Sequence, residues 1–596
     1  MVIKFGKWLT RHKAVVLIIA FLLLIPATIG YVSTRINYDL LSYLPNSLET
    51  VSGQDTMVDE FGMGAFSMIV VEDMEKKDIV ALKEKLKKVN HVEDVIWYDD
   101  AMDITVPTEM LPDKLREGLF NGNATMMIAL FDNTTSADST MDAITEMRGI
   151  VKKQAFISGM SGVVTDIKNL AMAEMPIYVV VAAVLSLLIL LLTMDSLVTP
   201  FIFLLGIGMA IVYNMGTNMV FGEISYITQA LTAILQLGVT MDYSIFLLES
   251  YEANKVRYDG DKNRAMAHAI SNTFTSVTSS SITTIAGFAA LCFMTFKLGM
   301  DLGLVMAKGV IIGVIVCLTV LPALILCFDK AIDKTTHKNL IPNLDGLSKK
   351  IVKGWPVVLV LFLVLLGPAM YGNSNYEIYY DIAGALPQSL DSAVANKKLE
   401  EKFNMNSTHI VLMKNGMASK EKSEMLKKIE DVKGVKWALG IDSFKGVSVP
   451  SSMIPKKLES KLKSDNYEIA FVCSDYKAAT DEVNSQIADI NKIVKKYSKD
   501  SMVIGEAPLT KDLQDVTDID LVNVNYVSVA AIFLIILITF KSILIPVILV
   551  MVIEFAIFLN MSVPFYTHES LPFVASIVIG TIQLGATVDY AILRRS

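Results

Sequence analysis

Long apolar runs recur along this chain, and they constrain its fold more than any other feature. A helix that crosses the hydrocarbon core of a bilayer needs about 20 mostly apolar residues. With 53% apolar residues the chain also exceeds the roughly 45–50% of soluble domains. The sequence therefore predicts a polytopic α-helical membrane protein. The expected spans are 14–32, 176–193, 200–220, 224–248, 279–295, 304–327, 356–371, 521–540, 545–562 and 571–593.

The distribution of lysine and arginine predicts the orientation of these spans. Short cytoplasmic segments carry an excess of both residues. The first 13 residues, the loop 249–278 and the loop 328–355 are all basic, and ten spans place all three on the same side. We therefore expect a multi-pass protein of the cell membrane with a cytoplasmic N-terminus. The long polar insertions 33–175 and 372–520 then lie outside the cytoplasm.

Both insertions alternate short apolar strand-like runs with amphipathic helical ones. The first contains "FSMIVVED", "VEDVIWYDD" and "ATMMIALF", separated by segments such as "KKDIVALKEKLKKV". The second contains "THIVLMKN", "VKWALGID" and "YEIAFVCSD" in the same order, again with helical segments between them. Strands alternating with helices predict an extracytoplasmic α/β domain, ferredoxin-like in type, in each insertion.

The two halves of the chain resemble each other over most of their length. "YDLLSYLPNSL" at 38–48 matches "YDIAGALPQSL" at 380–390, and "QLGVTMDYSI" at 236–245 matches "QLGATVDYAI" at 583–592. Each half runs from one helix through an outer domain into a helix bundle. Because the first half has an even number of spans, the second enters the membrane in the same direction, which predicts a parallel repeat. The second copy stops at "DYAILRRS", and we expect its last two spans to be absent from this chain.

This repeat divides the chain into seven parts. They are the first span within 1–32, an outer domain at 33–175, a bundle at 176–330, a cytoplasmic linker at 331–355, a span at 356–371, a second outer domain at 372–520 and an incomplete bundle at 521–596.

The repeated motif places an aspartate and a tyrosine inside an apolar span of each half. An ionisable residue in a bilayer span costs at least ~2.5–3.5 kcal/mol on insertion scales and is a functional candidate by default. Asp242 lies four residues after Gly238, so the two share a helix face, where the glycine lets a neighbouring helix approach. In the second copy Gly585 and Asp589 repeat this spacing, and Tyr590 follows the aspartate as Tyr243 does in the first copy. Two such carboxyls are suited to carrying protons, and a structural hydrogen bond between helices is the alternative.

Other polar residues near the motif are weaker candidates. Glu554 either joins a proton path or bonds a polar group on a neighbouring helix. Ser279 and Thr283 either line a hydrated path beside Asp242 or pack between helices. Thr240 and Thr587 fit packing or hydration better than chemistry. Outside the membrane, Asp39 and Asp381 of the "YD…LP" motif are expected to cap the entry to each outer domain, with a substrate role as the alternative.

Several functional classes find no support in the sequence. The net charge of −8 does not suit a nucleic-acid binder. The six histidines and four cysteines show no metal-ligand spacing. No phosphate-binding GxxxxGK[ST] loop and no nucleophile–base pair is apparent. We therefore expect no catalytic residue, no metal and no cofactor.

By these features the chain resembles the MMPL branch of the resistance–nodulation–division (RND) transporter superfamily. The resemblance rests on "GVTMDY", "GATVDY", "YDLLSYLP" and the two outer domains, and it covers almost the whole chain. It implies a pump of twelve helices, driven by the proton gradient, whose outer porter domains export hydrophobic or amphiphilic molecules such as lipids or drugs. It also implies that Asp242, Tyr243, Asp589 and Tyr590 form the proton relay. Implied partners are the lipid-like substrate, membrane lipids and a homo-oligomer, such as a trimer, or an accessory protein.

Two other functions stay open. One is a membrane receptor or scaffold without transport, related to sterol sensors, although such a protein has little need of two matched buried carboxyls. The other is a protein-secretion auxiliary of the same superfamily.

Overall fold

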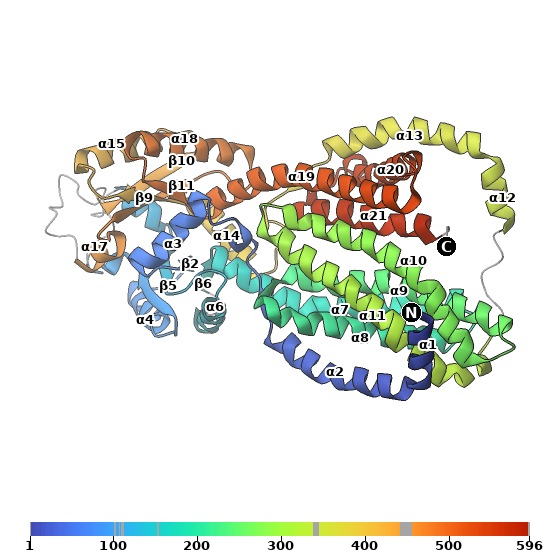
Figure 1. Cartoon of the computed structure of the whole chain (residues 1–596). Helices are drawn as coiled ribbons and strands as arrows, with labels where there is room; N and C mark the ends of the chain where they lie inside the picture. The colour runs from blue at the N-terminus through green and yellow to red at the C-terminus, as the bar shows by residue number, and fades with distance from the viewer. Residues whose placement is uncertain are drawn as a thin grey trace. The chain divides into compact units, whose positions relative to one another are not determined.

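The computed structural model describes residues 2–100, 103–105, 108, 113–151, 154–337, 345–441 and 456–593. The chain divides into two compact units, each built from separated segments (Figure 1). Met1–Asn37, Ala173–Tyr379 and Asp518–Ser596 form the helical unit. Tyr38–Met172 and Tyr380–Thr517 form the α/β unit.

The long helices follow the apolar runs of the sequence. Nine helices in the described part of the chain are long and apolar enough to cross a membrane. The tenth predicted span lies in α21, whose described apolar part, Phe573–Gly585, is shorter than a bilayer requires. The helices are α1 (Val2–Arg11), α2 (Lys13–Ser33), α7 (Met160–Thr193), α8 (Thr199–Gly216), α9 (Tyr226–Arg257), α10 (Lys262–Ala290), α11 (Lys297–Lys334), α12 (Asp345–Lys353), α13 (Trp355–Asn375), α19 (Glu506–Phe540), α20 (Leu544–Thr567) and α21 (Phe573–Leu593).

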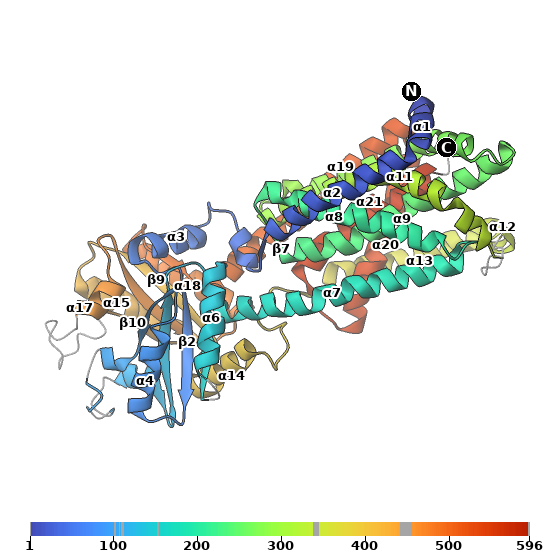
Figure 2. The same ribbon diagram turned by 90° about the horizontal axis from the view of Figure 1, so that it is seen from below.

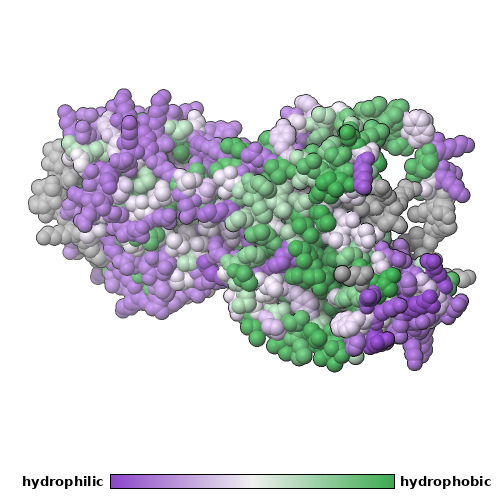
Figure 3. Space-filling model, in the orientation of Figure 1, coloured by the Kyte–Doolittle hydropathy of each residue, from purple (hydrophilic) through white to green (hydrophobic). Residues whose placement is uncertain are grey.

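Burial separates the inner helices of the helical unit from the outer ones. In α8 and α11 most residues of the apolar stretch are buried, 61% and 67% of them respectively. In α2, α7 and α13 only 11% or less of the apolar stretch is buried. Leucine, isoleucine and valine side chains of these outer helices are therefore exposed. Hydrophobic residues cover much of this unit in Figure 3. Such a surface is stable only in contact with lipid tails, so the chain is a multi-pass membrane protein.

Two small parallel sheets lie in the helical unit. β1 (Arg35–Asn37) pairs with β7 (Glu223–Ser225), directly before α9. β8 (Ile378–Tyr379) pairs with β13 (Leu571–Pro572), directly before α21. Each sheet thus joins the segment that follows α2 or α13, the first span of its half, to the start of a helix that carries the Asp–Tyr motif.

The α/β unit contains two sheets whose four main strands have the same topology, and the first sheet has an additional short strand, β4, paired with β5. All neighbouring strands are antiparallel, in the order β3-β5-β2-β6 in the first sheet and β10-β11-β9-β12 in the second. Numbered within each sheet, both orders read 2-3-1-4, which is the split βαβ arrangement of ferredoxin-like domains. The strands are β2 (Ala65–Glu72), β3 (Val92–Ile96), β4 (Phe120–Asn121), β5 (Ala124–Phe131), β6 (Ala155–Ser158), β9 (Ser407–Lys414), β10 (Val435–Gly440), β11 (Tyr467–Ser474) and β12 (Met502–Ile504). The helices and turns are η1 (Leu40–Tyr43), α3 (Glu49–Phe61), α4 (Lys76–Leu86), η2 (Tyr98–Asp100), α5 (Asp113–Leu119), α6 (Asp138–Val151), α14 (Asp391–Phe403), α15 (Ser419–Glu430), α17 (Lys456–Leu462) and α18 (Asp481–Tyr497).

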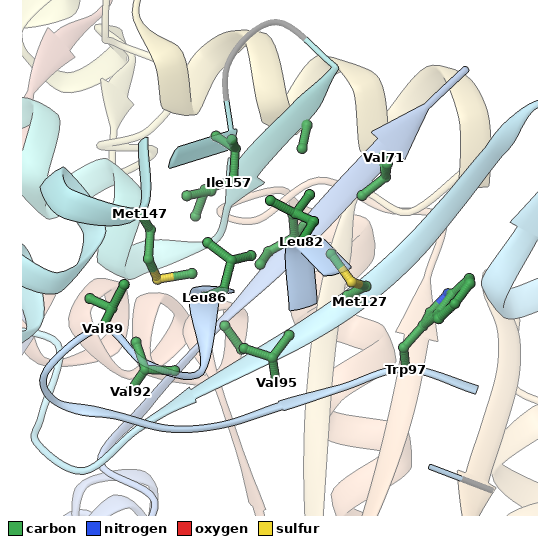
Figure 4. Close-up of a cluster of buried hydrophobic side chains, with 14 of the residues drawn as sticks. Val71, Leu82, Leu86, Val89, Val92, Val95, Trp97, Met127, Met147 and Ile157 are labelled. Atoms are coloured by element: carbon green, nitrogen blue, oxygen red, sulfur yellow. The ribbon is translucent and has the colours of Figure 1, made fainter. Parts of the chain in front are cut away.

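The central strands are apolar on both faces, and the structure shows the reason. One face of the first sheet packs under α4 and α6, where Leu82, Leu86 and Met147 meet Val71 and Met127 (Figure 4). The opposite face packs on residues of the second half, in two further buried clusters. A strand buried on both sides reads as a nearly continuous apolar run instead of an alternating one.

The two halves of the α/β unit exchange helices. α3 follows the first span in sequence but packs on β12 of the second sheet, where a Cβ atom on Gly53 would lie 2.4 Å from Ile504 Cγ2. Reciprocally, α14 packs on β6 of the first sheet. The two insertions, predicted as separate domains, are therefore joined into one unit, as two views of the same region show (Figures 1 and 2).

Candidate functional site

The Asp–Tyr motif of the first half lies in the middle of α9. The helix begins after Ser225, whose hydroxyl accepts a hydrogen bond from Ile227 N, an ordinary N-cap. Gln236, Thr240 and Tyr243 lie three or four residues apart and are all buried, with Tyr243 only 1% exposed. This face of α9 therefore belongs to the interior of the bundle.

Asp242 and Gly238 lie together at the edge of that buried face. Asp242 is half-buried and Gly238 is exposed. A Cβ atom on Gly238 would meet no atom of the described chain within 4 Å. No helix of the described chain packs closely against Gly238, and its role in helix packing stays a prediction.

The equivalent glycine of the second half does pack against a helix. A Cβ atom on Gly585 of α21 would lie 3.4 Å from Cα of Thr284 in α10. Gly238 and Gly585 occupy matching positions in the two halves of the sequence but have different surroundings among the described residues. The side chains of Asp589 and Tyr590, although they lie in α21, are outside the described residues as well.

The helix α10 contacts both helices that carry the motif. It packs against α9 and against α21. Thr283 of α10 is fully buried and Ser279 is half-buried, and the hydroxyl of Thr283 donates to the carbonyl oxygen of Ser280 at 2.5 Å. Thr587 likewise donates to its own helix, at Gln583 O. Hydroxyls bonded in this way fit packing between helices, and a hydrated path is not needed to explain them.

A buried pair of amides was not singled out from the sequence as a site. Asn214 Nδ2 of α8 donates to Gln236 Oε1 of α9 at 3.1 Å, and Gln236 Nε2 donates to Gly309 O of α11 at 3.2 Å. The same pair recurs in the second half, where Asn560 Nδ2 donates to Gln583 Oε1 at 3.2 Å. The signal was present, because both residues of each pair match between the halves.

A lysine near these amides was also not predicted as a site residue from the sequence. Lys308 lies in the apolar helix α11, and its ammonium donates to Asn214 O at 3.0 Å and to Asn218 Oδ1 at 2.5 Å. The ring of Phe221 lies 5.1 Å from this ammonium. The cation is thus held by carbonyl oxygens and an aromatic face, as a charge inside a membrane helix requires.

Glu554 of α20 is a further half-buried acid in the helical unit. Its Oε1 atom is buried and has no hydrogen-bond partner among the described residues. The bond to a neighbouring helix that its position suggested is therefore not formed by this atom.

The α/β unit encloses a cavity of about 420 Å³ between its two halves. Methionine side chains from both halves contribute to the wall, among them Met57, Met68 and Met405. Two acidic residues at equivalent positions of the repeat, Asp39 and Asp381, also line it. Glu506 is a third acidic residue of the wall. The matching position of the first half is Met160, which lines the cavity as well.

Asp39 and Asp381 both cap backbone turns, as predicted. Asp39 Oδ1 accepts from Leu41 N at 3.0 Å, and Asp381 Oδ1 accepts from Gly384 N at 2.7 Å. Burial raises the pKa of Asp39 from its ordinary 3.8 to about 6, against the lowering effect of its backbone hydrogen bonds. Within the described residues, no group of three or more histidine, cysteine or acidic side chains is arranged to hold a metal ion.

These features define a multi-pass membrane protein with an α/β unit that encloses a cavity, and with an acidic residue inside a membrane helix. The sequence pattern of the MMPL family matches residues 66–360 and 384–595, and the chain belongs to this family.

Several known proteins are similar to the chain at low identity. An apo-petrobactin exporter of Bacillus anthracis is 22% identical over 509 residues, which are 76% of this chain and 65% of the exporter. The probable transport protein MmpL12 of Mycobacterium tuberculosis is 24% identical over 289 residues, 46% of this chain and 25% of that protein. The chain thus spans less than two thirds of the length of either relative.

Proposed function

We propose that the chain acts as a proton-driven membrane transporter that exports hydrophobic or amphiphilic molecules. The observation that carries this proposal is an aspartate inside an apolar span, repeated in register with its glycine, threonine, tyrosine and bonded glutamine. The transport proteins among its relatives support the same class. The coupling ion is the proton, so no further cofactor is required.

In the proposed mechanism, Asp242 and Asp589 take up and release protons in alternation. A carboxyl in a low-dielectric site binds a proton readily, and its charge changes when the proton leaves. The neighbouring tyrosines, Tyr243 and Tyr590, donate hydrogen bonds to the charged form. Changes in charge on two equivalent helices rock the two bundles of a parallel repeat. The amide pairs Asn214–Gln236 and Asn560–Gln583 hold each bundle rigid while it moves.

The cavity of the α/β unit is the proposed substrate site, and the two sheets that form it act as porter domains. Methionine side chains adapt to irregular apolar shapes. Carboxyls beside them suit an amphiphile whose polar end donates hydrogen bonds or carries positive charge. We place these domains outside the cytoplasm because the basic segments 1–13, 249–278 and 328–355 mark the opposite side. Assembly as a homo-oligomer or with an accessory protein belongs to the same proposal.

The first test is the substitution Asp242→Asn, assayed as proton-coupled efflux from vesicles that contain the purified protein. An amide cannot carry the proton, so we expect coupled transport to fall at least about 100-fold, a typical cost of removing a proton-transfer group. The protein should still insert in the membrane, because Asn is nearly isosteric with Asp. The readout is substrate efflux together with the pH change inside the vesicle.

The matched control is Asp259→Asn, which makes the same chemical change at an exposed loop position. It should transport like the wild type. If Asp242→Asn keeps gradient-dependent efflux, the relay is wrong. If neither the wild type nor the variants transport any amphiphile, a receptor or secretion auxiliary becomes the better interpretation.

A further inference from the structure

A deep apolar groove runs along the lipid-facing side of the helical unit. It has a volume of about 640 Å³ and is lined by residues of α1, α2, α8, α11 and the short 3-10 helix η4 (Thr217–Phe221) that follows α8. Three residues of its wall carry hydroxyls, and each hydroxyl is bonded to a backbone oxygen. Tyr213 donates to Ala20 O at 2.5 Å, Thr217 to Tyr213 O at 2.9 Å and Thr319 to Ile315 O at 2.5 Å. The groove therefore offers an occupant an apolar wall whose hydroxyl donors are already bonded.

Small residues at one end of the groove set its shape. A Cβ atom on Gly216 would lie 2.1 Å from Ala27 O, and a Cβ atom on Gly30 would lie equally close to Gly216 O. The backbones of α2 and α8 therefore touch at this end. Towards α1, larger residues of α2, such as Ile19 and Leu23, replace the small ones and form one wall of the open groove.

The length of the groove matches one leaflet of a bilayer. Along α2 its wall extends from Val16 to Ala27, eleven residues on, which corresponds to about 17 Å at ~1.5 Å per residue. The hydrocarbon core of a bilayer is about 30 Å thick, so one leaflet accounts for roughly 15 Å of it. A single acyl chain that enters from one membrane surface would fill the groove.

The other end of the groove, its mouth, lies against the amphipathic helix α1. Gly6 fixes this helix on α10, because a Cβ atom there would lie 2.8 Å from Ala267 O. Phe5 and Trp8 point along the groove wall and remain 40% and 51% exposed. Their rings stack with centroids 6.2 Å apart. Exposed aromatic rings at this position are typical of a helix that lies in the membrane interface.

Basic residues of α1 lie beside the mouth of the groove. Lys4 and Arg11 are four residues before and three residues after Trp8, so they share its face of the helix. Both are exposed, and neither forms an ion pair with any described residue. Lys7 is also exposed, and it lies three residues after Lys4 and four residues before Arg11, on the same face of the helix as both.

We propose that this groove and α1 form a binding site for an anionic phospholipid. One acyl chain lies in the groove between α2, α8 and α11, and the phosphate lies between the side chains of Lys4 and Arg11. Charge complementarity at the mouth selects an anionic headgroup over a zwitterionic one. The site rests on the membrane location of the helical unit and is independent of proton coupling.

The test is native mass spectrometry of the purified full chain, equilibrated with equal amounts of phosphatidylglycerol and phosphatidylcholine. We expect the wild type to retain phosphatidylglycerol preferentially. The double variant Lys4→Gln/Arg11→Gln should lose this preference by about tenfold or more, as expected for two interfacial charges. The control Lys420→Gln/Lys427→Gln removes two exposed lysine charges from α15 of the α/β unit and should leave the preference unchanged.

A second pair of variants tests the groove itself. Ile315→Trp places a large side chain in the wall and should reduce retention of both lipids, whatever the headgroup. Ile311→Trp, one turn earlier on the same helix and outside the groove wall, should bind lipid like the wild type.

Three results would overturn the proposal. Equal retention of the two lipids by the wild type would remove the anionic selectivity. If Ile315→Trp and Ile311→Trp lose lipid equally, the groove does not hold the acyl chain. A change of oligomeric mass in Ile315→Trp alone would mean that a second copy of the chain, instead of a lipid, covers the groove.

Discussion

At the scale of single residues, the same residue type has different consequences at equivalent positions of the two halves. Gly585 lies against the backbone of α10, whereas Gly238 faces no atom of the described chain within 4 Å. Glu506 contributes a carboxyl to the cavity where Met160, its counterpart, contributes a thioether. The two halves thus match more closely in backbone than in side-chain chemistry.

Asp39 should make the stability of the α/β unit depend on pH. Its pKa of about 6 in the folded protein lies above the ordinary 3.8, so the folded state binds the proton more tightly than the unfolded state. The resulting stabilisation is full below about pH 4 and is lost as the pH rises through 6. Ionisation at pH 7.5 should therefore cost on the order of 2–3 kcal/mol.

The variant Asp39→Asn tests this dependence, because Asn also accepts the bond from Leu41 N. Thermal unfolding of the purified protein should show nearly equal midpoints for variant and wild type at pH 4. At pH 7.5 the variant should unfold several degrees higher. If the unfolding midpoints of variant and wild type differ by the same amount at every pH from 4 to 7.5, the raised pKa is contradicted.

At the scale of elements, helices that are distant in sequence complete one another. α11 begins without a side-chain cap of its own, since its N-cap position is Phe296. The carboxylate of Asp520 in α19 takes this role, accepting from Thr295 N at 2.9 Å and from Phe296 N at 2.8 Å. The residue is fully buried. A residue of the second half thus caps a helix of the first.

Replacing Asp520 by Ala should leave the buried N–H of Phe296 and the partly buried N–H of Thr295 without their acceptor. We expect a loss of about 1–3 kcal/mol in the free energy of unfolding, the cost of one unsatisfied buried donor. Hydrogen–deuterium exchange should increase selectively in the peptide around residues 294–300. The control Asp515→Ala removes an exposed carboxyl of the same helix and should change neither quantity by more than about 0.5 kcal/mol.

At the scale of the whole molecule, the exchange of α3 and α14 makes the α/β unit a single folding unit. Reciprocal contacts lock both helices in place. Asp166 Oδ2 accepts from Ser392 N at 2.8 Å, and its equivalent, Asp512, accepts from the hydroxyl of Thr50 at 2.5 Å. One buried cluster also combines residues of both sheets, such as Leu130 and Leu412. Neither sheet can bury its apolar face without the other half.

The variant Asp166→Ala should therefore loosen both halves. It lies in the first half, but α14 of the second half loses the acceptor for Ser392 N. We expect amide exchange to rise in β5 and in β11 together, by the same free energy of about 1–3 kcal/mol. Asp142→Ala, an exposed position, is the control. A rise confined to β5 would mean that the two halves fold independently.

The sequence alone determined the membrane class, because length and apolar character decide which helices a bilayer accepts. It also placed the strands and helices of both insertions and the caps at Asp39 and Asp381, since these depend on local patterns. Tertiary structure alone decided which elements pack together: the exchange of α3 and α14, the contact of Gly585 with α10, and the buried amide of Gln236. These features depend on contacts between residues up to several hundred positions apart, and one sequence carries no direct record of such contacts.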